Sequence, residues 1–584
     1  NKEAADYKKQ LKGKIKGKIL FVMIDIKQKD AFFSIAPLSR AVHDLEGDLQ
    51  VVVSDGKSNN IEILKDVWKV YEVLEKNVKT RETDALKGFI NAVDKKTKTK
   101  EFKNIFKKPE FILIADKKGF TGDIELKYRS GWHKDHRKNE LLATAKRIWK
   151  EGYSIKNGEK VSVSFVLIPS KKDIELPLED YLDSYSIAYS MATVAKGMGA
   201  KIGLAASTDR ISQLSKSMRT AELMATLRGC ELDKDVKDPV FRSYKKLSKL
   251  LKLDRMEFSA AAFGIHAKGY FGRHFFGERI GYPTLDKKTR WSSPGQMMLK
   301  DRYEPQSRYE KRDPKMRYAI TETLPIDIFI NTCNINYDIL RKRSIKIRDI
   351  FNKCSYIIVK GKKINGYRTD FRVDLIGKKG RREFTASDSD VTTIVDKEWF
   401  NKTGKKCGAY ANFPSGETFV TPEKIKGTMV GDVVININRS YVIPKKEPII
   451  VEFRGNEYRV ISAPEKIDSA MKKERGEARQ KLRSYEKNKS LPKEIIEIYK
   501  RNFMNIGEFA VNTNPKAKLC NYLIVNEKIA RMIHVALGLG FEADRKTLYH
   551  WDIVVNSPKQ KLDIYGVDEK GKEHWVIRKG EFAV

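Results

Sequence analysis

The sequence lacks the paired cysteines of a disulfide framework or a thiolate metal site. Its 584 residues contain five cysteines, an odd number, and no two of them form a Cys-x-x-Cys pair. The five are Cys230, Cys333, Cys354, Cys407 and Cys520. We therefore expect free thiols in a reducing compartment, and any metal site has to use other ligands.

A long apolar run is also missing. The longest weakly polar stretch, residues 186–207, is interrupted by Lys196 and Lys201 and is rich in glycine, alanine and serine. A membrane-spanning helix needs about 20 consecutive, mostly apolar residues. The first residues, Asn-Lys-Glu-Ala-Ala-Asp, contain no apolar core of a signal peptide. We expect a cytoplasmic protein without a membrane anchor.

Phosphate-binding loops are absent from an N-terminal part that otherwise alternates between strands and helices. Strand-like apolar runs occur at 18–24, 50–53, 111–115 and 161–168, and helical stretches at 61–75 and 139–150. This order is typical of parallel sheets, so we predict a Rossmann-like layered α/β domain over residues 1–215. Neither Gly-x-Gly-x-x-Gly after the first strand nor Gly-x-x-x-x-Gly-Lys-Ser/Thr occurs, which argues against a bound dinucleotide.

Residues 216–323 have a different composition. They are helical in pattern up to about residue 262, and residues 264–296 then combine many glycine, aromatic and arginine residues. We interpret the segment as an excursion that belongs to the N-terminal domain or forms a lid. Its histidines, His266 and His274, fit packing or surface roles better than metal binding, as does the pair His133 and His136.

The formal net charge is +38, which raises the question of a polyanionic partner. Lysines occur along the whole chain and are interleaved with acidic residues. The densest basic runs, 8–18, 95–108 and 378–382, lack the regular aromatic spacing of a base-stacking platform. We favour a solvated lysine-rich surface and keep a contact with RNA or the ribosome as an alternative.

From about residue 324 the pattern indicates an α+β domain that extends to residue 584. Strands are predicted at 356–359 and 371–376, a hairpin around Gly455-Asn456, a second hairpin at 568–571, and helices at 466–487 and 493–504. No internal repeat is present in the sequence.

This C-terminal part contains carboxylates and histidines in a pattern that suits a hydrolytic metal. The candidate ligands are Glu417, Glu508, His534, His550 and Asp552. His550 and Asp552 are two residues apart in a predicted strand and so share one face. Oxygen and imidazole donors without thiolate favour zinc, cobalt or manganese in an open catalytic site. Taken singly, each carboxylate also fits a turn, and His534 also fits a hydrogen-bonded core histidine.

Residues 412–422, Asn-Phe-Pro-Ser-Gly-Glu-Thr-Phe-Val-Thr-Pro, resemble a signature of the aminopeptidase T/aminopeptidase S family of thermophilic metallopeptidases. Further family-like motifs follow in the family's order, at residues 367–371, 506–508, 512–515, 526–529, 534–538 and 550–552. The resemblance spans roughly residues 340–580. The first 320 residues match only in general α/β character.

The resemblance implies a metallo-aminopeptidase that hydrolyses the N-terminal peptide bond of peptides through a metal-activated water. It implies two divalent ions, zinc, cobalt or manganese, held by Glu417, Glu508, His534, His550 and Asp552. Glu417 would also carry the proton to the leaving amine. The resemblance further implies a homodimer whose N-terminal domain closes over the cleft.

One position departs from the family pattern. The family has a catalytic tyrosine seven residues after the first histidine of His-x-Ala-x-Gly, and this chain has Phe541 there. Phenylalanine cannot donate a hydrogen bond to an oxyanion, so activity is reduced unless another donor, such as Tyr549, replaces it.

Two alternatives stay open. His534, His550 and Asp552 alone form a two-histidine, one-carboxylate set, which suits mononuclear iron and a ring-opening dioxygenase of the same scaffold. The other alternative is an inactive relative that binds RNA or the ribosome through its basic surface.

Overall fold

The computed structural model describes residues 2–54, 111–116, 119–123, 135–174, 176–207, 261–266, 317–377, 380–391, 409–437, 439–488, 493–540, 545 and 547–584. The predicted helix at 61–75, the residues His133, His274 and Phe541, and most of segment 216–323 lie outside these ranges. The described residues up to Ile330 form one compact unit, and those from Asn331 onward form a second.

The first unit alternates helices and strands, as the sequence predicts. Its elements are α1 (Lys2–Leu11), β1 (Ile19–Asp25), α2 (Lys29–Asp44), β2 (Asp48–Ser54), β3 (Phe111–Asp116), β4 (Gly119–Asp123), α6 (Lys138–Arg147), β5 (Lys160–Val166), α7 (Leu178–Gly197), β6 (Lys201–Ser207), β7 (Ala261–His266) and β8 (Arg317–Glu322). Helix α12 (Ile326–Cys333) follows. On α2, Phe32 packs against Phe165 of β5 and Tyr185 of α7, so aromatic rings bind these helices to the sheet.

The sheet of the first unit has the strand order β8-β7-β5-β6-β2-β1-β3-β4. Strands β8, β7, β5 and β6 are parallel to one another, as are β1 and β2. The pairs β2–β6, β1–β3 and β3–β4 are antiparallel. The α/β prediction is confirmed, but the sheet is mixed. For β3 and β4 the reason is the two-residue connection, which is too short for the crossover that a parallel pair requires.

The second unit contains β structure throughout. Its elements are α13 (Tyr337–Phe351), β9 (Cys354–Ile364), β10 (Tyr367–Asp374), β11 (Ile376–Gly377), β12 (Gly380–Arg381), β13 (Thr385–Ser387), β14 (Ala409–Asn412), β15 (Glu417–Val420), β16 (Lys424–Gly431), β17 (Val434–Asn436), β18 (Ser440–Val442), β19 (Ile449–Gly455), β20 (Glu457–Ser462), α15 (Glu465–Asn488), α16 (Lys493–Arg501), β21 (Ile506–Asn512), α17 (Leu523–Asn526), β22 (Ile533–Gly538), β23 (His550–Val555), α18 (Ser557–Gln560), β24 (Asp563–Asp568), β25 (Glu573–Arg578) and β26 (Glu581–Phe582). The predicted α+β character and both predicted hairpins, β19–β20 and β24–β25, are confirmed.

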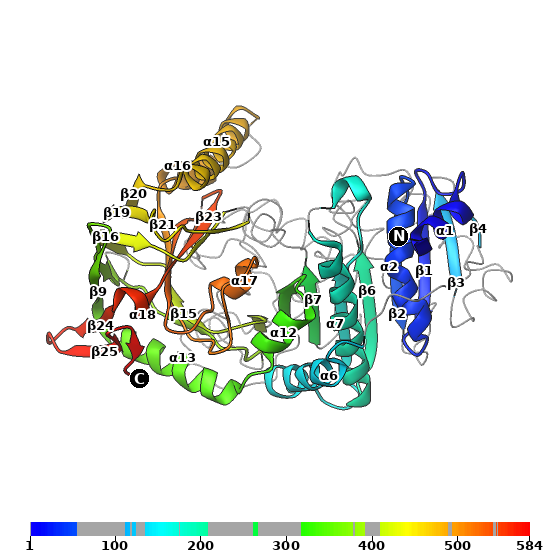
Figure 1. Cartoon of the computed structure of the whole chain (residues 1–584), viewed down its shortest axis with the longest axis horizontal. Coiled ribbons are helices and arrows are strands. Elements are labelled where there is room, and N and C mark those ends of the chain that lie inside the picture. The colour runs from blue at the N-terminus through cyan, green and yellow to red at the C-terminus, as the bar shows by residue number, and fades with distance from the viewer. Residues whose placement is uncertain are drawn as a thin grey trace. The chain divides into compact units, whose positions relative to one another are not determined.

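Two antiparallel sheets organise the second unit (Figure 1). One has the order β20-β19-β16-β10-β9-β24-β25-β26 and the other β13-β15-β21-β22-β23-β17-β18. Their facing apolar side chains form one core, in which the ring of Phe509 on β21 lies 6.1 Å from that of Phe371 on β10. We call the second of these the site sheet, because its other face carries the candidate ligands.

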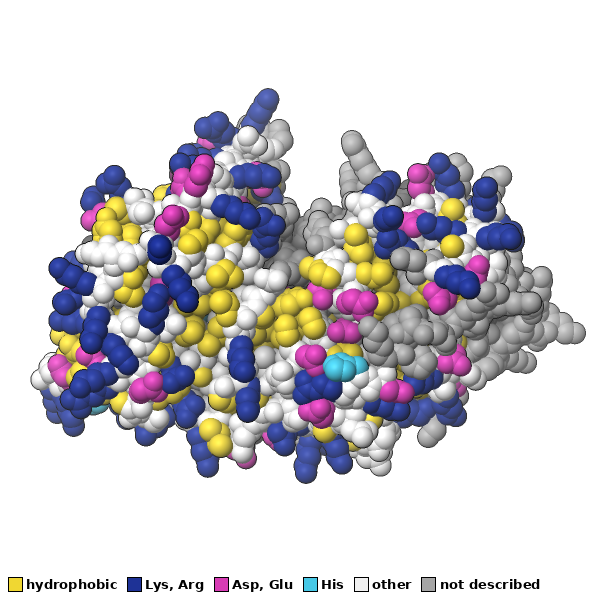
Figure 2. Space-filling view, viewed as in Figure 1, with side chains coloured by type: hydrophobic (Ala, Val, Ile, Leu, Met, Phe, Trp, Pro, Cys, Tyr) yellow, Lys and Arg dark blue, Asp and Glu magenta, His cyan; other side chains and the backbone are white. Residues whose placement is uncertain are grey.

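Among the described residues, no helix combines the length and the apolar character needed to cross a membrane. The described cysteines, Cys333, Cys354 and Cys520, are free thiols, as expected. Figure 2 shows lysine and arginine side chains spread over the visible face with acidic side chains between them, which matches the interleaving in the sequence.

Candidate metal centre

Alternation along three strands separates the apolar core from the candidate ligands. The side chains of β21, β22 and β23 that enter the core are Ile506, Phe509, Val511, Ile533, Val535, Leu537, Trp551, Ile553 and Val555, and a β-bulge separates Ile506 from Glu508. Successive side chains of a strand point to opposite faces. The intervening residues Glu508, His534, His550 and Asp552 therefore lie on the other face of the site sheet. Period-two patterning places these four residues on one face of the sheet.

The register of the strands sets which ligands become neighbours. Glu508 on β21 pairs with Ala536 on β22, and Ala536 pairs with Asp552 on β23. In the next strand pair, Glu417 on β15 lies opposite Asn512 on β21. The methyl group of Ala536 is thus the only side chain between two carboxylates in this row, and it leaves space above the middle of the sheet.

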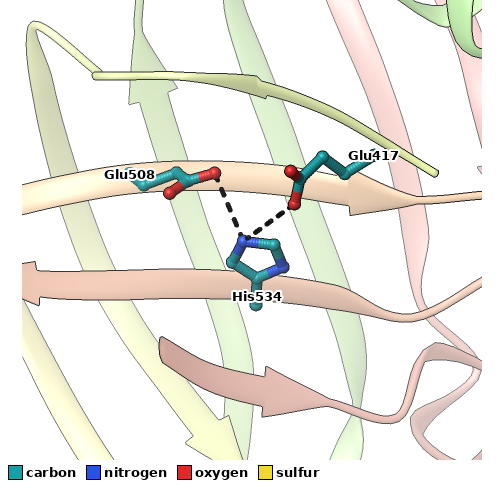
Figure 3. Close-up of side chains that lie close together, drawn as sticks. All are labelled: Glu417, Glu508 and His534. Atoms are coloured by element: carbon teal, nitrogen blue, oxygen red, sulfur yellow. Dashed lines mark hydrogen bonds and ion pairs between the residues drawn. The ribbon is translucent and has the colours of Figure 1, made fainter. Parts of the chain in front are cut away.

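The ligand atoms fall into two groups that share one residue. His534 Nε2 lies 3.3 Å from Glu508 Oε1 and 3.8 Å from Glu417 Oε2 (Figure 3). His550 Nε2 lies 3.6 Å from Glu508 Oε2 and 3.1 Å from Asp552 Oδ1. We call Glu417, Glu508 and His534 the first donor group, and Glu508, His550 and Asp552 the second. Within each group the ligand atoms lie within 4.8 Å of one another.

Hydrogen bonds orient both imidazoles for metal binding. His534 Nδ1 lies 2.9 Å from Oδ1 of Asn512, and His550 Nδ1 lies 2.8 Å from the carbonyl oxygen of Leu539. Both partners are acceptors, so each Nδ1 carries the hydrogen and donates it. In the neutral imidazole, each Nε2 then has a lone pair that faces the carboxylates. Outer partners of this kind fix the tautomer of metal-binding histidines.

The two donor groups differ in accessibility. The side chains of Glu417, Glu508, His534 and Asp552 are 8%, 5%, 1% and 3% exposed, whereas that of His550 is 17% exposed. His550 of the second donor group is therefore the most accessible of the five ligands.

In the metal-free centre, the neighbouring carboxylates stabilise the charged forms of both histidines. Burial lowers the pKa of His534, but the hydrogen bond and charge of Glu508, with Asp552 and Glu417, outweigh it and raise the pKa to about 9. Burial also opposes the charge of His550, and Asp552 and Glu508 raise its pKa to about 9. Burial raises the pKa of Asp552, yet His550 more than offsets this and holds it at about 2.

Two glycines bring ligand-bearing backbone into close contact. Gly416, at φ +128°, precedes Glu417, and a Cβ there would lie 2.7 Å from the backbone nitrogen of Asn514. Gly507 precedes Glu508, and a Cβ there would lie 2.1 Å from the carbonyl oxygen of Leu539. Any larger side chain would push these segments apart. The Gly-Glu pairs in the sequence are therefore required by close packing around the centre and are not simply turn carboxylates.

Sequence reasoning did not assign a role to three side chains that complete the centre. Lys528 Nζ lies 2.7 Å from Glu417 Oε2 and 2.7 Å from Glu527 Oε1. Burial raises the pKa of Glu527 to about 8 against the opposing effect of Lys528. Asn512 orients His534. The sequence could have indicated all three, because residues 512–515 and 526–529 are among the family-like motifs.

Tyr549 does not supply the donor that Phe541 lacks. It precedes His550, so its side chain lies on the core face, where its ring is 4.5 Å from that of Trp551. Its hydroxyl donates to the carbonyl oxygen of Phe503 and lies 2.8 Å from the hydroxyl of Tyr458. Tyr549 is therefore not the replacement donor that the sequence suggested, because adjacent strand residues face opposite sides.

The other histidines considered in the sequence belong to neither donor group where the structure describes them. His136 Nε2 lies 2.9 Å from Asp327 Oδ1 at an exposed position in the first unit. His266 is the last residue of β7.

The buried side chains define a candidate metal centre made of two overlapping donor groups, with three residues in each group and one carboxylate common to both. Centres of this composition are typical of metal-dependent hydrolases.

In a comparison with solved structures, the chain matches wild-type AmpT from Thermus thermophilus. The match has 13% sequence identity and a TM-score of 0.38, and it covers 76% of this chain and 100% of that chain. No family model matches the chain, and no curated protein matches it. At this identity and TM-score the likeness concerns the fold in outline, so the function proposed below rests on the side chains and the sequence motifs.

Proposed function

We propose that the protein is a metal-dependent aminopeptidase that hydrolyses the N-terminal peptide bond of peptides. The observation that carries the proposal is the position of Glu508, whose two oxygens face two different histidines. A carboxylate that faces both groups can bridge two cations. The choice of peptides as substrates comes from the motif resemblance over residues 340–580.

The residues present fit a pair of divalent ions. All ligand atoms are carboxylate oxygens or imidazole nitrogens, which suits zinc, cobalt or manganese. Both Nε2 atoms are oriented toward the carboxylates, and Asp552 Oδ1 is a buried oxygen that lies 3.1 Å from His550 Nε2. When bound, such ions lower the pKa of a water molecule and polarise the scissile carbonyl.

Residues of the chain orient the metal ligands and transfer the proton. Asn512 and the Leu539 carbonyl hold the two imidazoles in one tautomer. Glu417 is the proposed proton carrier, because its Oε2 pairs with Lys528 while its Oε1 has no hydrogen-bond partner among the described residues. Burial raises the pKa of Glu417, with Lys528 opposing and Glu508 adding to the rise, so this carboxyl accepts a proton more readily than a solvent-exposed glutamate does.

The distribution of ligands favours this function over the iron alternative. A mononuclear iron site would need His534, His550 and Asp552 around one cation. In the described residues the two histidines instead belong to different donor groups, each with its own carboxylates. The homodimer, the cytoplasmic location and the contact of the basic surface with RNA stay predictions.

Elemental analysis combined with hydrolysis of aminoacyl-amide substrates tests the proposal. After cobalt, zinc or manganese is restored, we expect close to two ions per chain and release of the N-terminal amino acid. Substrates with an acetylated N-terminus should not be cleaved. One iron per chain without hydrolysis would overturn the proposal in favour of oxygen chemistry, and the absence of any bound metal would overturn both.

A further inference from the structure

Lys528 is a buried cation inside the centre that belongs to neither donor group. Its side chain is 1% exposed, and its Nζ lies 2.7 Å from Glu417 Oε2 and 2.7 Å from Glu527 Oε1. An ammonium group has three N–H donors. Among the residues that the structure describes, only these two carboxylates accept from Lys528. One donor therefore remains for a group that enters the centre.

The backbone fixes Lys528 relative to Glu417 through one asparagine. The backbone N–H of Asn514 donates to the carbonyl oxygen of Lys528 at 3.0 Å. The side-chain amide of Asn514 donates to the carbonyl oxygen of Ser415 at 2.9 Å, two residues before Glu417. The segments that carry the ammonium group and the carboxylate are thus tied to the same residue, and the ammonium group is pre-positioned.

The positive charge of Lys528 is costly for a metal centre. An ammonium group beside Glu417 repels any cation that the first donor group holds. A neutral amide could also donate hydrogen bonds to these carboxylates without that repulsion. The two buried carboxylates balance the charge of the lysine, and its remaining N–H donor suits an anion that forms during the reaction.

We propose that Lys528 is a catalytic residue that donates a hydrogen bond from Nζ to the oxyanion formed at the scissile carbonyl. The inference rests on the proposed hydrolysis. The water oxygen bonds to the carbonyl carbon, and the carbonyl π electrons move onto its oxygen, which becomes the oxyanion beside Lys528. Glu417 accepts the proton that the water loses in this attack. When the carbonyl re-forms, the C–N bond breaks and Glu417 passes that proton to the leaving amine. Lys528 stays protonated throughout, and Glu527 anchors it.

The test compares three variants of the full chain, Lys528→Gln, Lys528→Arg and the exposed control Lys516→Met. Gln keeps hydrogen-bond donors but removes the charge, and Arg keeps both. Each is measured for metal content, for kcat and KM on an aminoacyl-amide, and for the Kd of a phosphonate dipeptide analogue, whose charged oxygens mimic the oxyanion.

We expect Lys528→Gln to keep its metals and its KM while kcat falls about 100-fold, the typical loss for one oxyanion donor. The Kd of the phosphonate should rise by a similar factor, and Lys528→Arg should recover part of both losses. Lys516→Met should behave like the wild type.

Wild-type kcat and phosphonate affinity in Lys528→Gln would overturn the inference. Loss of metal or of folding in both Lys528→Gln and Lys528→Arg would also overturn it, because it would show that the lysine serves the architecture. Failure of the proposed function looks different: the metal-loaded wild type itself would neither hydrolyse the amide nor bind the phosphonate.

Discussion

The two donor groups of the centre share Glu508 but differ in charge and access. The first contains the more deeply buried histidine, His534, and its other carboxylate, Glu417, pairs with the ammonium group of Lys528. The second contains His550, the most exposed of the ligands, and its carboxylate Asp552 pairs with that histidine. The first donor group is thus the more buried and lies beside Lys528, whereas the second contains the more exposed histidine.

This difference predicts unequal metal affinity. Two unit charges about 4 Å apart interact by about 4 kcal/mol at an effective dielectric constant of about 20. Repulsion from Lys528 therefore weakens the first donor group relative to the second. We expect the second group to fill at the lower metal concentration, which a two-step titration would show.

The largest expected effect comes from the residue that the two halves share. Glu508→Ala removes a ligand oxygen from both donor groups, so metal content should fall from about two ions per chain to almost none, and hydrolysis should fall below detection. Elemental analysis and an aminoacyl-amide assay measure this. Glu452→Ala, on the other sheet, is the matched control and should change neither. Retention of both ions in Glu508→Ala would show that the two halves do not depend on a common carboxylate.

The next largest effects are expected from substitutions that remove the histidine of one donor group. His550→Ala should leave one ion in the first donor group, and His534→Ala should leave one in the second, each with hydrolysis abolished. Because Lys528 weakens the first group, the ion left in His534→Ala should be held more tightly than the one left in His550→Ala. Equilibrium dialysis against a metal buffer measures both affinities. Equal affinities would contradict the comparison.

A smaller effect is expected from the residue that orients His534. Asn512→Leu removes the acceptor for Nδ1, and the loss of such an outer partner typically weakens metal binding about 10–100-fold. Only the first donor group should be affected. Asn436→Leu is the control, since Asn436 lies on the same sheet face opposite Asp552 but does not bond to a histidine. An equal loss from both groups in Asn512→Leu would count against separate halves.

The smallest effect concerns the stability of the metal-free protein. The pKa values of His534 and His550 are raised to about 9, so their charged forms stabilise the fold. That contribution is complete below the unfolded-state value near 6.5 and is lost as pH rises through 9. In the presence of a chelator, Tm should fall between pH 7 and pH 10. The double variant His534→Asn with His550→Asn corrects for other groups, and an equally steep fall in it would refute the assignment.

Much of this centre was predictable from strand patterning. His550 and Asp552 are two residues apart in a strand, so their common face follows from sequence. The predicted strands and hairpins of the second unit formed because their apolar residues alternate. In the first unit β1, β2, β3 and β5 were also predicted, but β4 and its antiparallel pairing with β3 were not, because strand direction depends on the length of the connection between paired strands.

The pairing of ligands was not predictable in the same way. That Glu508 faces two histidines depends on the register of β21, β22 and β23, and a shift of one residue would turn the ligands to the core face. The position of Lys528 depends on hydrogen bonds from Asn514, which connect segments about 100 residues apart. Neither the strand register nor the hydrogen bonds of Asn514 produce a periodic pattern in the sequence.

The sequence by itself determined which residue types were available for chemistry and which face of each strand they occupy, because side-chain direction follows from local backbone geometry. Only the tertiary structure decided that five ligands divide into two groups around one carboxylate, that Tyr549 is turned away, and that a lysine is buried beside Glu417. Those outcomes depend on strand register and on contacts between distant loops, which local geometry does not specify.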